Sequence, residues 1–279
     1  MPTEAFRAAC VQMRSGVDRA RTIDAAEALI REAAGAGATF ISTPEMTNVL
    51  DKESKRLRRT LSDSNEADAD RFAALARDLG VWLHLGSLAV LLDDGAVANR
   101  AYLIDPAGAI VARYDKIHLF DVDLPTGERW RESAVFRGGT RSVVARTPLA
   151  AFGLSICYDL RFPAHYRAMA RTGADVLLAP AAFTKPTGEA HWETLLRARA
   201  IENGAFVIAA AQGGRHEDGR ETYGRSLIVS PWGDVLSKRD DDAPGLIFAD
   251  IEPAAAARAR AAIPNLALDP AYEVSIITS

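Results

Sequence analysis

Three reactive side chains each come directly after a segment with the composition of a buried strand. Glu45 lies in "STPEM", Lys116 in "RYDKIHLF" and Cys157 in "LSICYDLRF". In layered α/β folds, ligand sites gather at strand ends, so three separate segments can bring their side chains to one cleft. We therefore expect these residues to meet, although spacing along the chain does not itself place them together.

A carboxylate, an ammonium and a thiol in one cleft have a coherent chemistry. A thiol becomes a good nucleophile once a nearby carboxylate accepts its proton, and an ammonium and a helix N-terminus stabilise the thiolate. When the thiolate attacks an amide or nitrile carbon, negative charge develops on the heteroatom. The lysine and the backbone N–H of Tyr158 are suitable donors to that charge, each typically worth roughly 3 kcal/mol. The carboxylate can then protonate the departing amine and activate water.

Each of these residues also has an ordinary structural interpretation. A cysteine at the end of an apolar strand is more often an inert small hydrophobe than a nucleophile. Glu45 alone is compatible with an acid at a helix N-terminus, and Lys116 alone with a surface charge.

The pattern along the chain is that of an α/β fold. The apolar run at 6–13 reads as a strand, the helically spaced segment at 21–38 as a helix, and 39–46 as a second strand that runs into a turn. Helix and strand patterns then alternate, including a helix at 191–205, and the last third returns to hairpin-like strands. No linker or charge block divides the sequence, so we expect one domain over 1–279, with the tail after about 264 the hardest part to interpret.

Composition excludes several classes of protein. The 279 residues carry a net charge of -4, which offers no broad basic field for nucleic acid. No apolar segment reaches the length of a membrane span, and the N-terminus lacks a secretory pattern, so we expect a soluble cytoplasmic protein. Cys10 and Cys157 are interpreted as free thiols, and no cluster has metal-ligand spacing. We expect neither a metal nor a cofactor.

Three ordered motifs give a resemblance to a known family. The segments "PEM", "YDKIHLFDVDLP" and "SICYDLRFP" resemble the signatures of the nitrilase superfamily of carbon–nitrogen hydrolases. The resemblance extends from "AACVQM" through "PWGDVLSK". It implies that Glu45 is the general base, Lys116 the oxyanion-stabilising lysine and Cys157 the nucleophile. The family's additional glutamate matches Glu132 in "WRESAVF" and would hold Lys116; the alternative, a surface salt bridge, fits Glu128 better.

The same resemblance implies a four-layer α-β-β-α sandwich, usually paired into a homodimer or a higher homo-oligomer. Two departures from the family stand out. Asp115 occupies a position where relatives often carry arginine, and the segment "IPNLALDPAYEVSIITS" matches the family's tail only loosely because it lacks an arginine-rich stretch.

The surrounding segments favour one branch of the superfamily. The segment "CYDLRFP" and the region 182–235, with "AAQGGRHEDGRETYG" in particular, look most like the branch assigned to deaminated-glutathione amidase, with omega-amidase as its near neighbour. These substrates are small carboxylates with an amide. Arg161 could pair with such a carboxylate, unless it forms a structural ion pair with Asp159 or another buried acid. Phe183 and Thr184 could line the pocket, although a strand-end Phe is more often core.

Other functions remain open at this stage. The catalytic residues do not separate amidases from carbamoylases, aliphatic amidases or nitrilases. A non-catalytic binding or scaffold protein is the alternative of a different class. A serine hydrolase is disfavoured because no "GxSxG" occurs, and nucleotide enzymes are disfavoured because neither "GxxxxGK[ST]" nor "GxGxxG" occurs.

Overall fold

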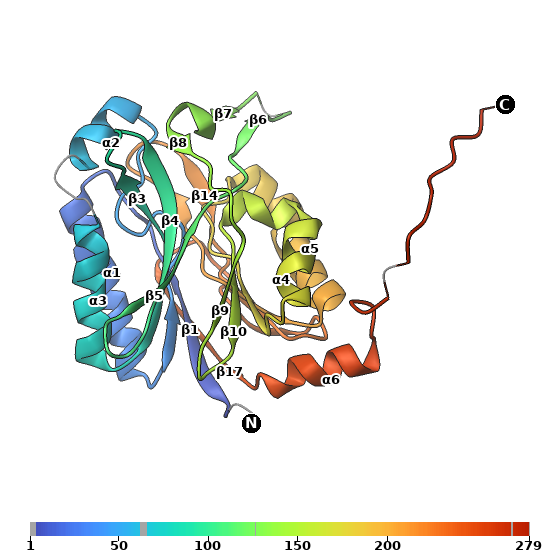
Figure 1. Cartoon of the computed structure of the whole chain (residues 1–279). Coiled ribbons are helices and arrows are strands. Elements are labelled where there is room, and N and C mark those ends of the chain that lie inside the picture. Colours follow the sequence, from blue (N-terminus) through green and yellow to red (C-terminus); the bar gives the residue numbers. More distant parts are fainter. Residues whose placement is uncertain (1–3, 62–65, 126, 269, 279) are drawn as a thin grey trace.

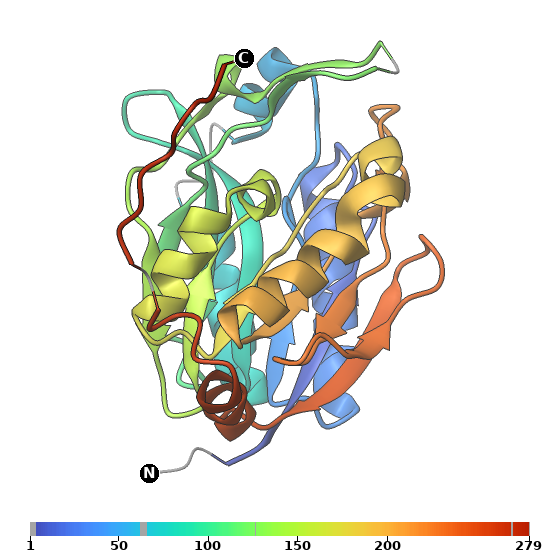
Figure 2. The same ribbon diagram turned by 90° about the vertical axis from the view of Figure 1, so that its right-hand side faces the viewer.

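Two mixed β-sheets lie face to face between two layers of helices (Figure 1). The computed structural model describes residues 4–61, 66–125, 127–268 and 270–278. Helices α1 (Arg19–Gly35) and α3 (Ala67–Leu79) cover the outer face of one sheet. Helices α4 (Pro163–Arg171) and α5 (Lys185–Asn203) cover the outer face of the other, as the turned view in Figure 2 shows. This arrangement confirms the expected α-β-β-α sandwich.

The first sheet has seven strands in the order β17-β1-β2-β3-β4-β5, with β8 paired to β4. Its strands β1, β2 and β3 run parallel, and the outer pairs are antiparallel. The strand bounds are β1 Phe6–Gln12, β2 Phe40–Ser42, β3 Trp82–Leu91, β4 Val97–Ile104, β5 Ile110–Asp115, β8 Phe136–Arg137 and β17 Gly245–Ile251.

The second sheet has six strands in the order β16-β15-β12-β11-β10-β9, with β10, β11 and β12 parallel. Their bounds are β9 Val143–Arg146, β10 Ala151–Leu154, β11 Val176–Leu178, β12 Phe206–Ala209, β15 Leu227–Val229 and β16 Val235–Lys238. Two small hairpins lie outside the main sheets: β6 Asp121–Asp123 with β7 Arg129–Arg131, and β13 Gly213–Arg215 with β14 Glu221–Tyr223.

Four shorter helical elements complete the described structure. They are α2 (Ser54–Leu61), α6 (Ala254–Ala262) and the 3₁₀ turns η1 (Glu132–Ala134) and η2 (Cys157–Arg161). No helix within the described ranges is both long enough and apolar enough to cross a membrane.

The side-chain alternation of the strands divides the interior into two apolar regions. On β1, Ala8 and Cys10 face the second sheet, whereas Ala9 and Val11 face the helices α1 and α3. Between the sheets, Phe40 of β2 stacks on Phe152 of β10 with ring centroids 4.7 Å apart. These contacts fix the distance between the two sheets and therefore between the residues at their ends.

Two elements differ from the sequence-based expectation. Helix α5 begins at Lys185 rather than near 191, because proline is tolerated in the first turn of a helix and "KPTGEA" therefore need not be a loop. Strand β10 ends at Leu154 rather than directly before Cys157, so Ser155 and Ile156 separate the strand from Cys157, which opens the 3₁₀ turn η2.

The start of the segment after α6 is held against the body of the protein. Asn265 donates to the Glu202 carbonyl at 2.7 Å, and its own carbonyl accepts from Arg167 at 2.9 Å. The described residues 270–278 are exposed and contain no helix or strand, and Figure 1 shows this segment running away from the body.

Candidate active site

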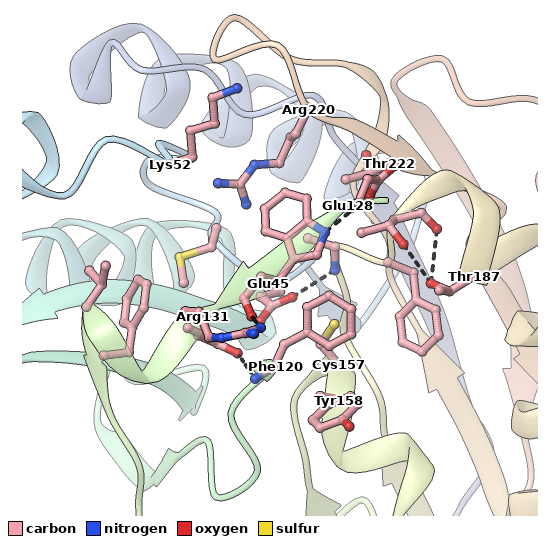
Figure 3. Close-up of a pocket in the computed structure, with 18 of the residues that line it drawn as sticks. Glu45, Lys52, Phe120, Glu128, Arg131, Cys157, Tyr158, Thr187, Arg220 and Thr222 are labelled. Carbon is pink, nitrogen blue, oxygen red and sulfur yellow. Dashed lines mark hydrogen bonds between the residues drawn. The ribbon is translucent and has the colours of Figure 1, made fainter. Parts of the chain in front are cut away.

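One cavity of about 530 Å³ opens where the two sheets end. All eight residues that the sequence singled out line it: Glu45, Lys116, Glu132, Cys157, Tyr158, Arg161, Phe183 and Thr184. Figure 3 shows Glu45 and Cys157 facing the same hollow, with Phe120 and Tyr158 beside them. The expected convergence at strand ends therefore occurs, although the residues come from both sheets and from the loops between them.

A buried lysine joins two glutamates at the floor of the cavity. Lys116 Nζ lies 2.8 Å from Glu45 Oε1 and 2.9 and 3.0 Å from the two oxygens of Glu132. The Lys116 side chain is only 2% exposed. Its charge is thus compensated on both sides, which is what burial of an ammonium requires.

Asn99 is a functional-site residue that the sequence analysis missed. Its side-chain amide donates to Glu45 Oε1 at 2.8 Å and to Glu132 Oε1 at 3.2 Å, and its backbone carbonyl accepts from the Lys116 backbone N–H at 2.9 Å. Asn99 lies within β4, and an asparagine in "VANRAYLI" carries no sequence signal of its own. Only the pairing of β4 with β5 brings it beneath Lys116.

Cys157 has an uncommon backbone conformation. Its φ is 50°, in the left-handed region that non-glycine residues rarely adopt, and its N–H donates to the Pro180 carbonyl at 2.8 Å. Its thiol lines the same cavity as Glu45, whose Oε2 accepts from the Ala182 N–H at 2.9 Å. Such strain is characteristic of side chains that a turn presents to a reactant.

The electrostatics assign the protons in the resting site. Burial raises the pKa of the Cys157 thiol well above its ordinary value, and the Glu45 charge adds to that effect. Burial also opposes ionisation of Glu45, but the Lys116 charge and hydrogen bonds outweigh it and lower the pKa of Glu45. Burial opposes the charge on Lys116, yet Glu132 and Glu45 raise its pKa. The site thus holds an ionised glutamate, a charged lysine and a neutral thiol.

A second buried network connects the segment after Lys116 with the turn of Cys157. Asp159 accepts from Tyr114 Oη at 2.6 Å, from the Ile156 N–H at 2.8 Å and from the His118 N–H at 3.0 Å. His118 Nδ1 lies 2.7 Å from the same carboxylate. His165 completes a group of three possible metal ligands that the sequence did not indicate, but the Asp159 oxygens already accept these N–H and O–H donors. This network positions the loop.

Asp159 therefore does not pair with Arg161, which answers one of the alternatives for that arginine. The Arg161 guanidinium lies 3.3 Å from His191 Nδ1 and 5.3 Å from the centre of the Phe183 ring. Within the described residues no carboxylate lies within 4 Å of it. Phe183 packs on Trp192, and Thr184 Oγ1 bonds Thr187 Oγ1 at 2.8 Å.

Two acids near the site, Glu128 and Asp115, form no ion pair with Lys116 in the described part of the chain. Glu128 accepts a hydrogen bond from the Trp130 indole N–H at 3.2 Å. The surface salt bridge suggested for Glu128 does not occur among the described residues. Asp115, the position that departs from the family, pairs with Arg100 at 2.6 Å and does not line the cavity.

The comparisons with known proteins decide the family. The family model "Carbon-nitrogen hydrolase" matches residues 7–261. The chain belongs to the carbon–nitrogen hydrolase family. This confirms the resemblance that the three motifs carried, and with it the prediction of a carbon–nitrogen hydrolase.

Several proteins are similar to this member of the carbon–nitrogen hydrolase family over most of its length. A deaminated glutathione amidase of Synechocystis is 39% identical over 265 residues, covering 94% of this chain and 97% of the relative. One of Dictyostelium discoideum is 48% identical over 187 residues, covering 66% of this chain. The solved C. elegans NitFhit structure has a TM-score of 0.89 at 35% identity, covering 96% of this chain. The matches span 64% of the Dictyostelium protein and 65% of the NitFhit chain.

Proposed function

We propose that this protein hydrolyses the amide of a small carboxylate substrate through a thioester on Cys157, with deaminated glutathione as the substrate. The observation that carries the proposal is the buried Glu45–Lys116–Glu132 contact, with the Cys157 thiol in the lining of the same cavity. Relatives named deaminated glutathione amidase support the choice of substrate.

The first half-reaction begins with Glu45 as general base. It accepts the thiol proton as Cys157 Sγ attacks the amide carbon, which converts the carbonyl oxygen to an oxyanion. Lys116 and the Tyr158 N–H donate to that oxyanion. Collapse of the intermediate breaks the C–N bond, Glu45 returns its proton to the departing amine, and the acyl group stays on sulfur as a thioester.

The second half-reaction uses the same residues. Glu45 takes a proton from water as the water oxygen attacks the thioester carbon. Collapse releases the carboxylic acid, and the proton on Glu45 returns to the thiolate. Glu132 acts through Lys116, whose ammonium donates to both of its carboxylate oxygens, and Asn99 acts through Glu45 and Glu132, to which its side-chain amide donates.

The acyl half of the substrate carries a carboxylate, for which Arg161 is the proposed anchor. Its guanidinium lies in the cavity lining four residues after the nucleophile, next to an imidazole and a ring instead of an acid. A planar guanidinium with free donors suits bidentate contact with a carboxylate. Phe183 and Thr184 would form the wall beside it.

Omega-amidase activity on α-ketoglutaramate is the alternative within the family, since it has the same acyl half and would use the same anchor. Amine and ammonia release should therefore be measured side by side on deaminated glutathione, α-ketoglutaramate, an aliphatic amide, a nitrile and an N-carbamoyl compound. The largest kcat/KM on deaminated glutathione supports the proposal. Preference for the nitrile or carbamoyl compound contradicts the proposed substrate class.

We also propose that the chain folds as one domain and forms a homodimer in the cytoplasm. The support is the family's usual pairing and a single continuous apolar cluster that spans both sheets. Light scattering at micromolar concentration tests the dimer, and a monomeric mass would contradict it.

A further inference from the structure

The end of the cavity opposite Cys157 carries positive charge that the proposed mechanism does not use. Lys52 lies between β2 and α2, and Arg220 lies at the start of β14; both line the cavity. Figure 3 shows the two side chains together at one end, with Cys157 and Tyr158 at the other. A molecule that reacts at Cys157 would therefore need length to reach them.

The buried carboxylate of Asp218 holds both residues in place. Asp218 Oδ2 accepts from the Lys52 backbone N–H and from Arg220 Nε, each at 2.9 Å, and the Asp218 side chain is fully covered. Arg220 also lies over the Trp130 ring, 5.3 Å from its centre. The Lys52 ammonium reaches the same turn, because a Cβ at Gly219 would lie 3.6 Å from its Nζ.

The carboxylates nearest to Lys52 form ion pairs with other residues. Asp218 pairs with Arg220, and the neighbouring Asp51 pairs with Arg56 at 2.5 Å. Across the described ranges, no carboxylate oxygen lies within 4 Å of Lys52 Nζ. An anion at this end of the cavity would thus meet an uncompensated ammonium.

The other acidic side chains that line the cavity do not neutralise Lys52. Glu128 accepts the Trp130 indole N–H, and Glu221 lies 4.0 Å from Lys185. Glu45 and Glu132 are bound to Lys116 at the other end.

We propose that Lys52, supported by Arg220, binds a carboxylate on the leaving amine of the substrate. The proposal rests on the proposed function and deepens it. Cleavage at Cys157 divides the substrate into an acyl half and an amine half. In deaminated glutathione the amine half is cysteinylglycine, which ends in a carboxylate, whereas α-ketoglutaramate releases only ammonia. The cavity volume is within the range of sites that hold ligands of that size.

The subsite gives this protein a way to discriminate between the two substrates that the catalytic residues cannot distinguish. Arg161 would hold the carboxylate common to both, and Lys52 the carboxylate of only one. Because Lys52 is exposed to solvent, its contribution should be modest and should weaken as salt is added.

The test compares deaminated glutathione with the same molecule carrying a C-terminal primary amide. Both have the same acyl half and scissile bond. We expect the wild-type kcat/KM to favour the free carboxylate by about three- to tenfold, and this ratio to approach one in Lys52→Met and at high salt. Lys55→Met is the matched control, since Lys55 is exposed on α2 and lies outside the cavity lining; its ratio should equal that of the wild type.

The outcomes separate this proposal from the proposed function. Equal wild-type rates on the two compounds, or a Lys52→Met ratio like that of the wild type, would overturn the subsite while leaving the amidase intact. If the wild type hydrolyses only α-ketoglutaramate, the proposed substrate is wrong. Cysteinylglycine is then tested as an inhibitor of that reaction: inhibition lost in Lys52→Met supports the subsite, and absent or unchanged inhibition overturns it.

Discussion

At the residue scale, the site keeps its nucleophile neutral until a substrate arrives. Cys157 is buried beside an ionised carboxylate, so a resting thiolate would add a further negative charge next to the one ammonium that already pairs with Glu45 and Glu132. Proton transfer to Glu45 is favourable once charge moves onto the substrate oxygen, where Lys116 can stabilise it. The arrangement therefore couples activation of the thiol to binding of an amide.

This assignment of protons predicts the pH dependence of the site. The pKa of Glu45 is lowered from 4.5, so Glu45 stays deprotonated as pH falls to about 5, and it should impose no acidic limb on kcat/KM between about pH 5 and 7. The pKa of Cys157 is raised above 9.0, so alkylation by iodoacetamide without substrate should stay slow until above about pH 9. Alkylation that reaches its plateau near neutral pH would reveal a resting thiolate.

Glu132 should matter through Lys116 and not through substrate binding. Glu132→Gln removes one of the two charges that hold Lys116, so we expect kcat to fall about 100-fold with little change in KM. Steady-state kinetics on the preferred amide provide the measurement.

Glu128→Gln is the control for that variant, because Glu128 lines the same cavity but bonds the Trp130 indole. It should retain kcat within a few-fold of the wild type. Similar losses in both variants would show that any charge change in this loop is damaging, contrary to a specific role for Glu132.

At the element scale, the close approach of three backbone segments gives the site its geometry. Gly86, within β3, lies where a Cβ would be 2.1 Å from the Thr43 carbonyl oxygen and 2.5 Å from Pro180 Cβ. Thr43 precedes Glu45, and Pro180 accepts the Cys157 N–H. A glycine at this point of a strand lets the segments from the two sheets approach.

Gly86→Ala should consequently separate the base from the nucleophile. We expect a loss of stability of about 1–3 kcal/mol and a drop in kcat larger than the change in unfolded fraction explains. Urea unfolding and kinetics on the folded protein measure the two effects. Gly35→Ala is the control, since nothing lies within 4 Å of a Cβ there, and a Gly86→Ala protein that behaves like it would refute this view of the strand.

At the scale of the whole molecule, the contact between the sheets connects stability to the site. Phe152 is fully buried, stacks on Phe40 and approaches Phe6 with ring centroids 6.1 Å apart. Phe152→Ala should destabilise the fold by about 3–5 kcal/mol in equilibrium unfolding. Val111→Ala, at a side chain that is 47% exposed, should cost far less. Comparable losses in the two variants would contradict a core centred between the sheets.

The sequence predicts the layered fold and the three reactive residues because both are local signals. Strand and helix patterns repeat along the chain, and Glu45, Lys116 and Cys157 lie in ordered motifs. Asn99 and Asp159 could not be recognised this way: their partners lie on other elements and become neighbours only through strand pairing and loop closure. The extra turns of α5 were missed because "KPTGEA" resembles a loop until its proline occupies the first helical turn.

The most direct test of the account is the mass of the protein during turnover. In the wild type, rapid acid quenching during turnover of the preferred amide followed by peptide mapping should show an acyl adduct on Cys157 and none on Cys10. Cys10 is a suitable internal comparison because it is the other free thiol and is buried in β1. Turnover with Cys157 unmodified, or an adduct found equally on both cysteines, would contradict the thioester mechanism.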